Sequence, residues 1–120
     1  MSNADTTRIT ANKALQVLEI FRALDTDMPV GEVVSFLLIA LGETSDGGGP
    51  TVTEVGQKGG FSLASASRHV KSLGNMDRYG KKGHELVTDP RDPKDDRRKV
   101  LKLTHKGRTI LNQIEAAIRS

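Results

Sequence analysis

Residues 51–73 read TVTEVGQKGGFSLASASRHVKSL, and they predict two short helices joined by a tight turn. Thr51 and Glu54 have the spacing of a capping box, in which two side chains satisfy backbone N–H groups at the start of a helix. Gly60 suits the left-handed conformation that ends many helices, and Ser62 is a favourable N-cap for the helix that follows. Two helices across a glycine turn form a candidate helix-turn-helix unit.

Two further helices are predicted before this unit. Over residues 10–24, apolar side chains recur at spacings of three and four, which is typical of an amphipathic helix, whereas residues 1–9 are expected to be flexible. The segment 28–43 is apolar nearly all round and has Pro29 in its first turn, so we expect it to be the central core helix. Three consecutive glycines and a proline make residues 44–50 a loop.

An irregular loop, a hairpin and a final helix are predicted after the two short helices. The polar segment 75–84 is interrupted by glycines and favours a loop. Within residues 85–104, the stretches ELVTDP and RKVLKLT favour two short strands joined by a long charged tip. Thr104 can cap a helix over residues 104–119, whose apolar stripe reaches the end of the chain. The stripe comprises Ile110, Leu111, Ile114, Ala117 and Ile118.

The length and composition indicate one domain and limit its chemistry. A chain of 120 residues is expected to fold as a single, mainly α domain with a small β-hairpin. Without cysteine, the chain has no disulfide, no thiolate zinc site and no cysteine nucleophile. The N-terminal residues lack the apolar core of a signal peptide, and no apolar run is long enough to span a membrane. We therefore expect a cytoplasmic location and no membrane partner.

Charge is distributed unevenly along the chain. Residues 1–60 carry 4 Lys and Arg against 8 Asp and Glu, whereas residues 61–120 carry 14 against 7. Such a basic half provides the attraction to phosphate that nucleic-acid binding requires. The same asymmetry also arises on solvated surfaces that bind nothing, so charge alone does not decide the function.

The order of predicted elements, four helices, a hairpin and a helix, is that of a winged helix-turn-helix domain. With TEVGQKGGFSLASASRHVKSL, ELV and VLKLTHKG, the chain resembles the MarR family of winged-helix transcription regulators over residues 30–112. The most specific match is Asp95 and Arg97, as the family's D-x-R in the wing, followed by L-T-x-x-G at residues 103–107. The resemblance implies sequence-specific binding of double-stranded DNA by a transcription regulator, with repression as the expected direction.

The helix that follows Ser62 is the expected recognition helix. Its apolar side is expected to face the core through Leu63, Ala66, Val70 and Leu73. Its polar side can bind DNA, because short hydroxyls approach phosphates or base edges and an arginine can reach guanine or the backbone. The alternative is a solvated polar face without DNA contacts. The residues expected to contact DNA from this helix are Ser62, Ser65, Ser67, Arg68, His69 and Lys71.

The charged tip of the hairpin is the expected wing, within residues 85–104. In the MarR family the aspartate of D-x-R orients the arginine, and the match implies these roles for Asp95 and Arg97. An arginine held in this way can enter the negative potential of a narrow minor groove. Nearby basic residues would add attraction to phosphate, and they are Arg91, Lys94, Arg98 and Lys99. The alternative is an exposed loop whose ion pairs contribute little to stability.

Three features depart from the family pattern. Gly56 and Gly59 weaken the first helix of the unit, so we expect that helix to be frayed or irregular. The loop 75–84 is an addition, and its basic residues either extend the basic surface or are merely solvated. These residues are Arg78, Lys81 and Lys82. The sequence stops after one C-terminal helix, whereas the family continues into another helix that contributes to dimerisation.

A homodimer is nevertheless expected, because a symmetric protein doubles its contacts on a palindromic site. The terminal helices carry apolar residues that either pair with a second subunit or pack within one. These residues lie around Leu15, Leu18, Ile114 and Ile118.

Catalysis and cofactor binding are not expected. His69, His84 and His105 lie on three different predicted elements without the spacing of metal ligands. The serines and glycines match neither a nucleophile elbow nor a phosphate-binding loop. We therefore expect no metal and no cofactor, and the sequence assigns no residue to a small-molecule effector. The alternative function is a winged-helix module that binds another protein, such as a transcription or host factor.

Overall fold

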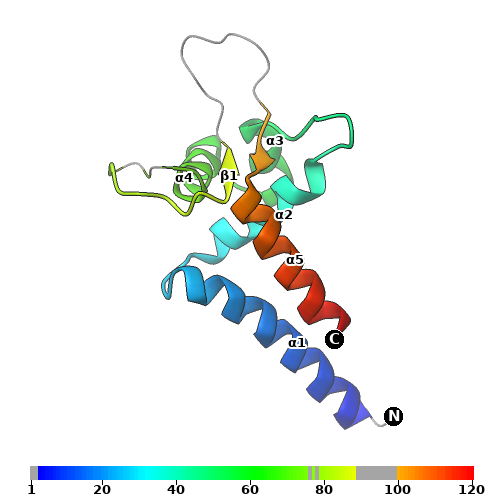
Figure 1. Cartoon of the computed structure of the whole chain (residues 1–120). Coiled ribbons are helices and arrows are strands. Elements are labelled where there is room, and N and C mark those ends of the chain that lie inside the picture. Colours follow the sequence, from blue (N-terminus) through cyan, green and yellow to red (C-terminus); the bar gives the residue numbers. More distant parts are fainter. Residues whose placement is uncertain (1–2, 76, 78, 89–99) are drawn as a thin grey trace.

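The structure is a computed structural model that describes residues 3–75, 77, 79–88 and 100–120. Within these residues, five α-helices and two short antiparallel strands follow one another along the chain (Figure 1). They are α1 (Asn3–Leu24), α2 (Val30–Gly42), α3 (Val52–Gly59), α4 (Leu63–Leu73), β1 (Val87–Thr88), β2 (Lys102–Leu103) and α5 (His105–Arg119). The predicted mainly α chain with a small β-hairpin is confirmed. No helix in the described part combines the length and apolar character that a membrane span requires.

The helix α2 lies at the centre of the fold, as its apolar sequence predicted. Pro29 precedes the helix in an extended conformation, with φ −63° and ψ 144°. Phe36 and Ile39 are completely buried, and α2 packs against α3, α4 and β2. Phe36 also meets Phe21 of α1 edge to face, with ring centroids 5.7 Å apart. The buried hydrophobic core comprises Phe21, Phe36, Ile39, Val52, Val55, Ala66, Val70, Leu73, Leu86, Val87, Leu101, Leu103, Ile110 and Ile114.

The helices α1 and α5 pack against each other, and the N-terminal end of α1 lies on the same side of the molecule as the C-terminal end of α5 (Figure 1). α1 begins at Asn3 instead of at the predicted Thr10, because no glycine or proline interrupts the helix there. The segment that was expected to be flexible is therefore helical from Asn3 onward. Of the predicted α5 stripe, Ile110 and Ile114 are buried, whereas Ile118 is 56% exposed. Lys13 Nζ donates to the Ile118 carbonyl oxygen at 2.9 Å and joins the two helices.

The turn between α3 and α4 has the caps that the sequence predicts. Thr51 Oγ1 accepts from the Glu54 N–H at 3.2 Å, and Glu54 Oε1 accepts from the Thr51 N–H at 3.1 Å. Gly60 ends α3 in the left-handed conformation with φ 71°. Ser62 Oγ then accepts from the Ser65 N–H at 3.1 Å at the start of α4. These local hydrogen bonds fix where both helices begin.

The prediction of a frayed or irregular first helix is wrong, because α3 is a continuous α-helix from Val52 to Gly59. Gly56 is buried at the place where α3 meets the turn and α4. A Cβ on Gly56 would lie 3.2 Å from the Phe61 carbonyl oxygen and 3.4 Å from Ala66 Cβ. The glycine therefore permits a close helix crossing, and this packing offsets its low helix propensity.

The base of the hairpin is held by α2 and by the loop 44–50. Val87 pairs with Leu103 in the antiparallel register, and the Leu101 N–H donates to the Pro50 carbonyl oxygen at 2.7 Å. Glu43, directly after α2, accepts from the Leu103 N–H at 2.6 Å. The strands are shorter than the predicted extended stretches.

Candidate nucleic-acid interface

One side of α4 is anchored in the core. Ala66, Val70 and Leu73 are completely buried, as predicted. The prediction that Leu63 also faces the core is wrong, since its side chain is 61% exposed. Leu63 is the first residue of α4 and lies at the edge of the buried stripe, where the helix starts. The burial of the other three residues fixes which side of α4 is turned outward.

The outward side of α4 begins with a chain of hydrogen bonds between polar side chains. Ser62 Oγ donates to Ser65 Oγ at 3.0 Å, and Arg68 Nη2 donates to the same Ser65 oxygen at 3.1 Å. Arg68 and Lys71 are exposed, and neither forms an ion pair within the described residues. A guanidinium has five N–H donors in a fixed fork, so one bond to Ser65 leaves Arg68 further donors for an acceptor outside the chain.

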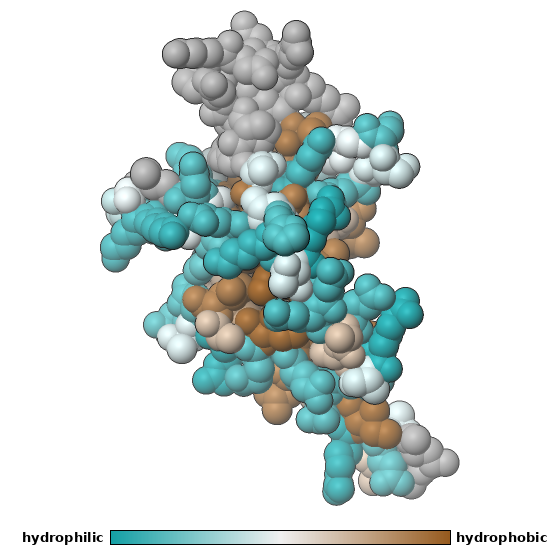
Figure 2. Space-filling model, viewed as in Figure 1, coloured by the Kyte–Doolittle hydropathy of each residue, from teal (hydrophilic) through white to brown (hydrophobic). Residues whose placement is uncertain are grey.

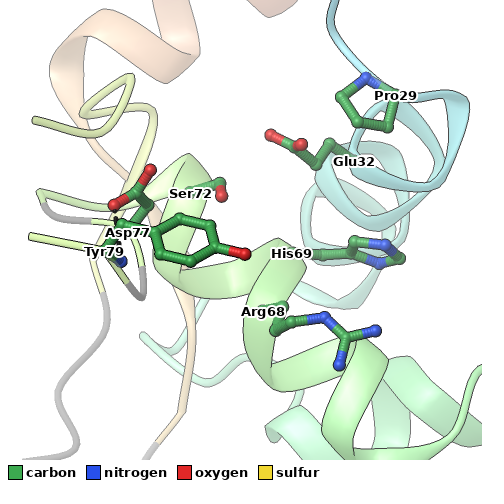
Figure 3. Close-up of a pocket in the computed structure, with 7 residues that line it drawn as sticks. All are labelled: Pro29, Glu32, Arg68, His69, Ser72, Asp77 and Tyr79. Atoms are coloured by element: carbon green, nitrogen blue, oxygen red, sulfur yellow. Dashed lines mark hydrogen bonds between the residues drawn. The ribbon is translucent and has the colours of Figure 1, made fainter. Parts of the chain in front are cut away.

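The His69 side chain is directed toward α2 (Figure 3). Its Nδ1 lies 3.1 Å from Ser35 Oγ, and its ring meets Phe61 edge to face with centroids 4.7 Å apart. A Cβ on Gly31 of α2 would lie 2.6 Å from His69 Cε1, so the helices are closely packed here. Burial, and then the Arg68 charge, lower the pKa of His69. His69 therefore joins α4 to α2 and is partly buried, whereas the neighbouring Arg68 is exposed.

The loop after α4 forms a compact turn around one carboxylate. Asp77 Oδ1 accepts from the Tyr79 and Lys81 N–H groups, each at 2.9 Å. The chain then returns to α4, where the His84 N–H donates to the Ser72 carbonyl oxygen at 2.9 Å. The predicted loop is thus confirmed as irregular but hydrogen-bonded. Its exposed basic residues in the described part are Lys81 and Lys82, and Arg78 lies outside that part.

Several predicted DNA contacts fall at the tip of the hairpin, outside the described residues. They are Arg91, Lys94, Asp95, Arg97, Arg98 and Lys99. The part of the candidate interface that the structure describes is therefore the outward side of α4 and the base of the hairpin. Of the predicted helix residues, Ser62, Arg68 and Lys71 are exposed, and Ser65 and Ser67 are partly buried.

Sequence reasoning missed Glu43, which ties the hairpin base to two other elements. Besides the bond from Leu103, its Oε2 accepts from Arg108 Nη2 at 2.9 Å. The partners are 60 and 65 positions away in sequence, and no local pattern of residues marks such a contact. The Glu43 side chain is only 13% exposed, so it is a structural support for the hairpin.

Comparison with known proteins gives one informative result. No protein-family model matches the chain, and no curated protein matches it either. The chain is similar to a solved structure, the crystal structure of RV1404 from Mycobacterium tuberculosis, with a TM-score of 0.62 and 16% sequence identity. The match covers 97% of this chain and 68% of the other. At this identity the likeness is one of fold.

Proposed function

We propose that the chain is a DNA-binding transcription regulator that reads double-stranded DNA through a winged helix-turn-helix domain, with repression as the expected direction. The observation that carries this proposal is the position of Arg68. It lies on the outward side of α4, held by Ser65, while the opposite side of the same helix is buried through Ala66 and Val70. A recognition helix needs this combination of a rigid mounting and an outward cation.

The N-terminus of α4 is suited to binding a phosphate group, and the middle of the helix is suited to contacting base edges. Backbone N–H groups and the positive end of the helix dipole attract anions at a helix N-terminus, which here follows Ser62. Arg68 can donate two parallel hydrogen bonds to guanine O6 and N7, or bind a phosphate oxygen. Lys71, one turn further along, adds a second exposed cation.

In this proposal the hairpin is the wing beside the recognition helix. The resemblance to MarR proteins implies that Asp95 orients Arg97 for the minor groove, and the basic residues around them would bind phosphates. Glu43 supports this arrangement, since it fixes the β2 backbone to α2 through Leu103. A hairpin with a fixed base loses less conformational freedom when its tip meets DNA.

We further propose that two copies of the chain pair through α1 and α5. Leu15, Leu18 and Ile118 are 50–56% exposed on these helices, and Ile9 is 43% exposed. In Figure 2, apolar atoms reach the surface over the part of the molecule where α1 and α5 lie. Burying them against a second copy would remove apolar surface from water and place two recognition helices on one duplex.

Selection from genomic DNA tests this function. Purified protein is mixed with fragmented genomic duplex at low salt, and the captured fragments are sequenced. The proposal expects enrichment of a shared motif with two related half-sites, and binding that weakens steeply as salt rises. Failure to retain any duplex at low salt would contradict the function itself. Enrichment of a single, unrepeated half-site would contradict only the dimer.

A further inference from the structure

Two adjoining cavities lie between α2, α4 and the loop 75–85. Their volumes are about 300 and 270 Å³, and both are lined by Glu32, Ser72 and Asp77. We refer to them together as the carboxylate cleft. Figure 3 shows Glu32 reaching from α2 toward Ser72 on α4, with Asp77 and Tyr79 approaching from the loop. Asp25 and His84 line the second cavity.

Glu32 is a buried acid with an unsatisfied oxygen. The residue is 8% exposed, and its Oε1 is buried with no hydrogen-bond partner among the residues that the structure describes. His84 Nε2 lies 3.8 Å from this oxygen, beyond hydrogen-bond distance. Burial first, and then the charges of Asp25 and Asp77, raise the pKa of Glu32 to about 7. A buried acceptor without a donor costs free energy, so a donor brought by a ligand would stabilise the site.

Carboxylates and lysines both line the second cavity, where Lys81 and Lys82 lie beside Asp25, Glu32 and Asp77. Asp25 Oδ2 lies 3.6 Å from His84 Nε2, on the same histidine nitrogen that approaches Glu32. The Lys82 side chain is 78% exposed and pairs with Glu85 at 3.6 Å. Besides burial, Asp25 and Asp77 are the charged groups that raise the pKa of Glu32, so the electrostatic potential at the Glu32 carboxyl is negative and favours a cationic occupant.

We propose that the carboxylate cleft binds a small organic cation with N–H donors, namely a primary ammonium on a short carbon chain. Glu32 Oε1 accepts one N–H, and the carboxylates of Asp77 and Asp25 balance the charge. The described residues include no group of three or more acids, histidines or cysteines placed to hold a metal ion, which favours an organic cation. The volumes limit the ligand to a small molecule.

The cleft adjoins the outward side of α4, because Arg68 and His69 also line the first cavity. A bound cation would thus contact the helix that we propose to read DNA, together with α2 and the loop. Binding itself does not depend on DNA. The cleft can therefore be tested on the isolated chain, whatever the outcome of the DNA experiments.

Nuclear magnetic resonance titration with three probes tests the ligand class. Labelled protein at pH 8, where Glu32 is ionised, is titrated with n-butylammonium, tetramethylammonium or butyrate at constant ionic strength. The expected result is saturable shifts of the Glu32, Ser72 and Gly83 amide signals with n-butylammonium only. Tetramethylammonium has the charge without N–H donors, and butyrate has the opposite charge. Absence of saturable shifts, or equal binding of all three probes, would overturn the proposal.

Two substitutions locate the site. Glu32→Gln and Asp77→Asn are each expected to weaken n-butylammonium binding at least about tenfold, because each removes a charged acceptor. Asparagine at position 77 keeps an oxygen for the Tyr79 and Lys81 N–H groups, so the turn is retained. Asp27→Asn is the control, since it makes the same change of charge on the α1–α2 loop without lining either cavity. Thermal unfolding confirms that each variant is folded. Unchanged affinity in both cleft variants, or an equal loss in the control, would overturn the assignment.

Discussion

His69 on α4 places its Nδ1 3.1 Å from the hydroxyl of Ser35 on α2, and its Cε1 lies where a side chain at Gly31 would be. This contact, together with the buried apolar stripe, fixes the rotation of α4 about its own axis. The direction in which Arg68 points is therefore set by residues that would not touch DNA.

The first prediction concerns Gly31. Alanine at this position would bring a Cβ within 2.6 Å of His69 Cε1, so Gly31→Ala should lower the free energy of unfolding by about 1–3 kcal/mol. Urea denaturation measures the change. In a His69→Ala background the clash is absent, and the same substitution should cost much less. An equal cost in both backgrounds would show that His69 is not the neighbour that matters.

The second prediction concerns Glu43. Glu43→Gln weakens the acceptor for the Leu103 N–H and the Arg108 ion pair, and should cost about 1–3 kcal/mol of unfolding free energy. Hydrogen exchange of the Leu103 amide should become faster. Glu115→Gln serves as the control, because it removes an exposed pair with Arg119 that contributes less than about 1 kcal/mol. Unchanged Leu103 exchange would contradict the support that we assign to Glu43.

The third prediction concerns pH and Glu32, whose pKa rises from 4.5 to about 7 on folding. Between pH 4.5 and about 7, the Glu32 carboxyl is protonated in the folded chain but ionised in the unfolded chain. The free energy of unfolding therefore falls as pH rises through this range, and Glu32 does not change it further above about pH 7. The stability of Glu32→Gln relative to wild type should therefore increase from pH 4.5 to pH 8, by up to about 3 kcal/mol. Urea denaturation at both pH values measures this, and a constant difference would show that Glu32 is not perturbed.

The fourth prediction concerns the hairpin tip. If Asp95 orients Arg97 in the minor groove, Arg97→Ala and Asp95→Ala should each weaken binding to a selected duplex, and the double variant should lose less than the sum. Fluorescence anisotropy measures the affinities. Simple additivity would contradict the pairing, and wild-type affinity in Arg97→Ala would remove the tip from the interface.

Local features of the fold could be predicted from sequence, and long-range ones could not. The caps at Thr51, Ser62 and Thr104 depend on residues within one turn, and all three are confirmed. The regularity of α3 was missed, because Gly56 is stabilised by a helix crossing that composition does not show.

The candidate site shows the same limit. The sequence placed Arg68 and His69 on one polar side, since neighbours in a polar stretch look alike. Only the packing of α2 separates them, through Ser35 and Gly31. The burial of Glu32 likewise depends on the loop after α4, which lies far away in sequence. The DNA contacts expected of residues 91–99 remain predictions from the sequence.

Binding of Arg68→Ala to a duplex recovered by genomic selection tests the central claim most directly. Fluorescence anisotropy at several salt concentrations compares this variant with wild type and with Arg119→Ala, which removes an equal charge at the far end of α5. The account expects Arg68→Ala to bind at least about tenfold more weakly and with a shallower salt dependence, and Arg119→Ala to bind like wild type. Equal affinity and equal salt dependence for Arg68→Ala and wild type would contradict the claim that the outward side of α4 binds DNA.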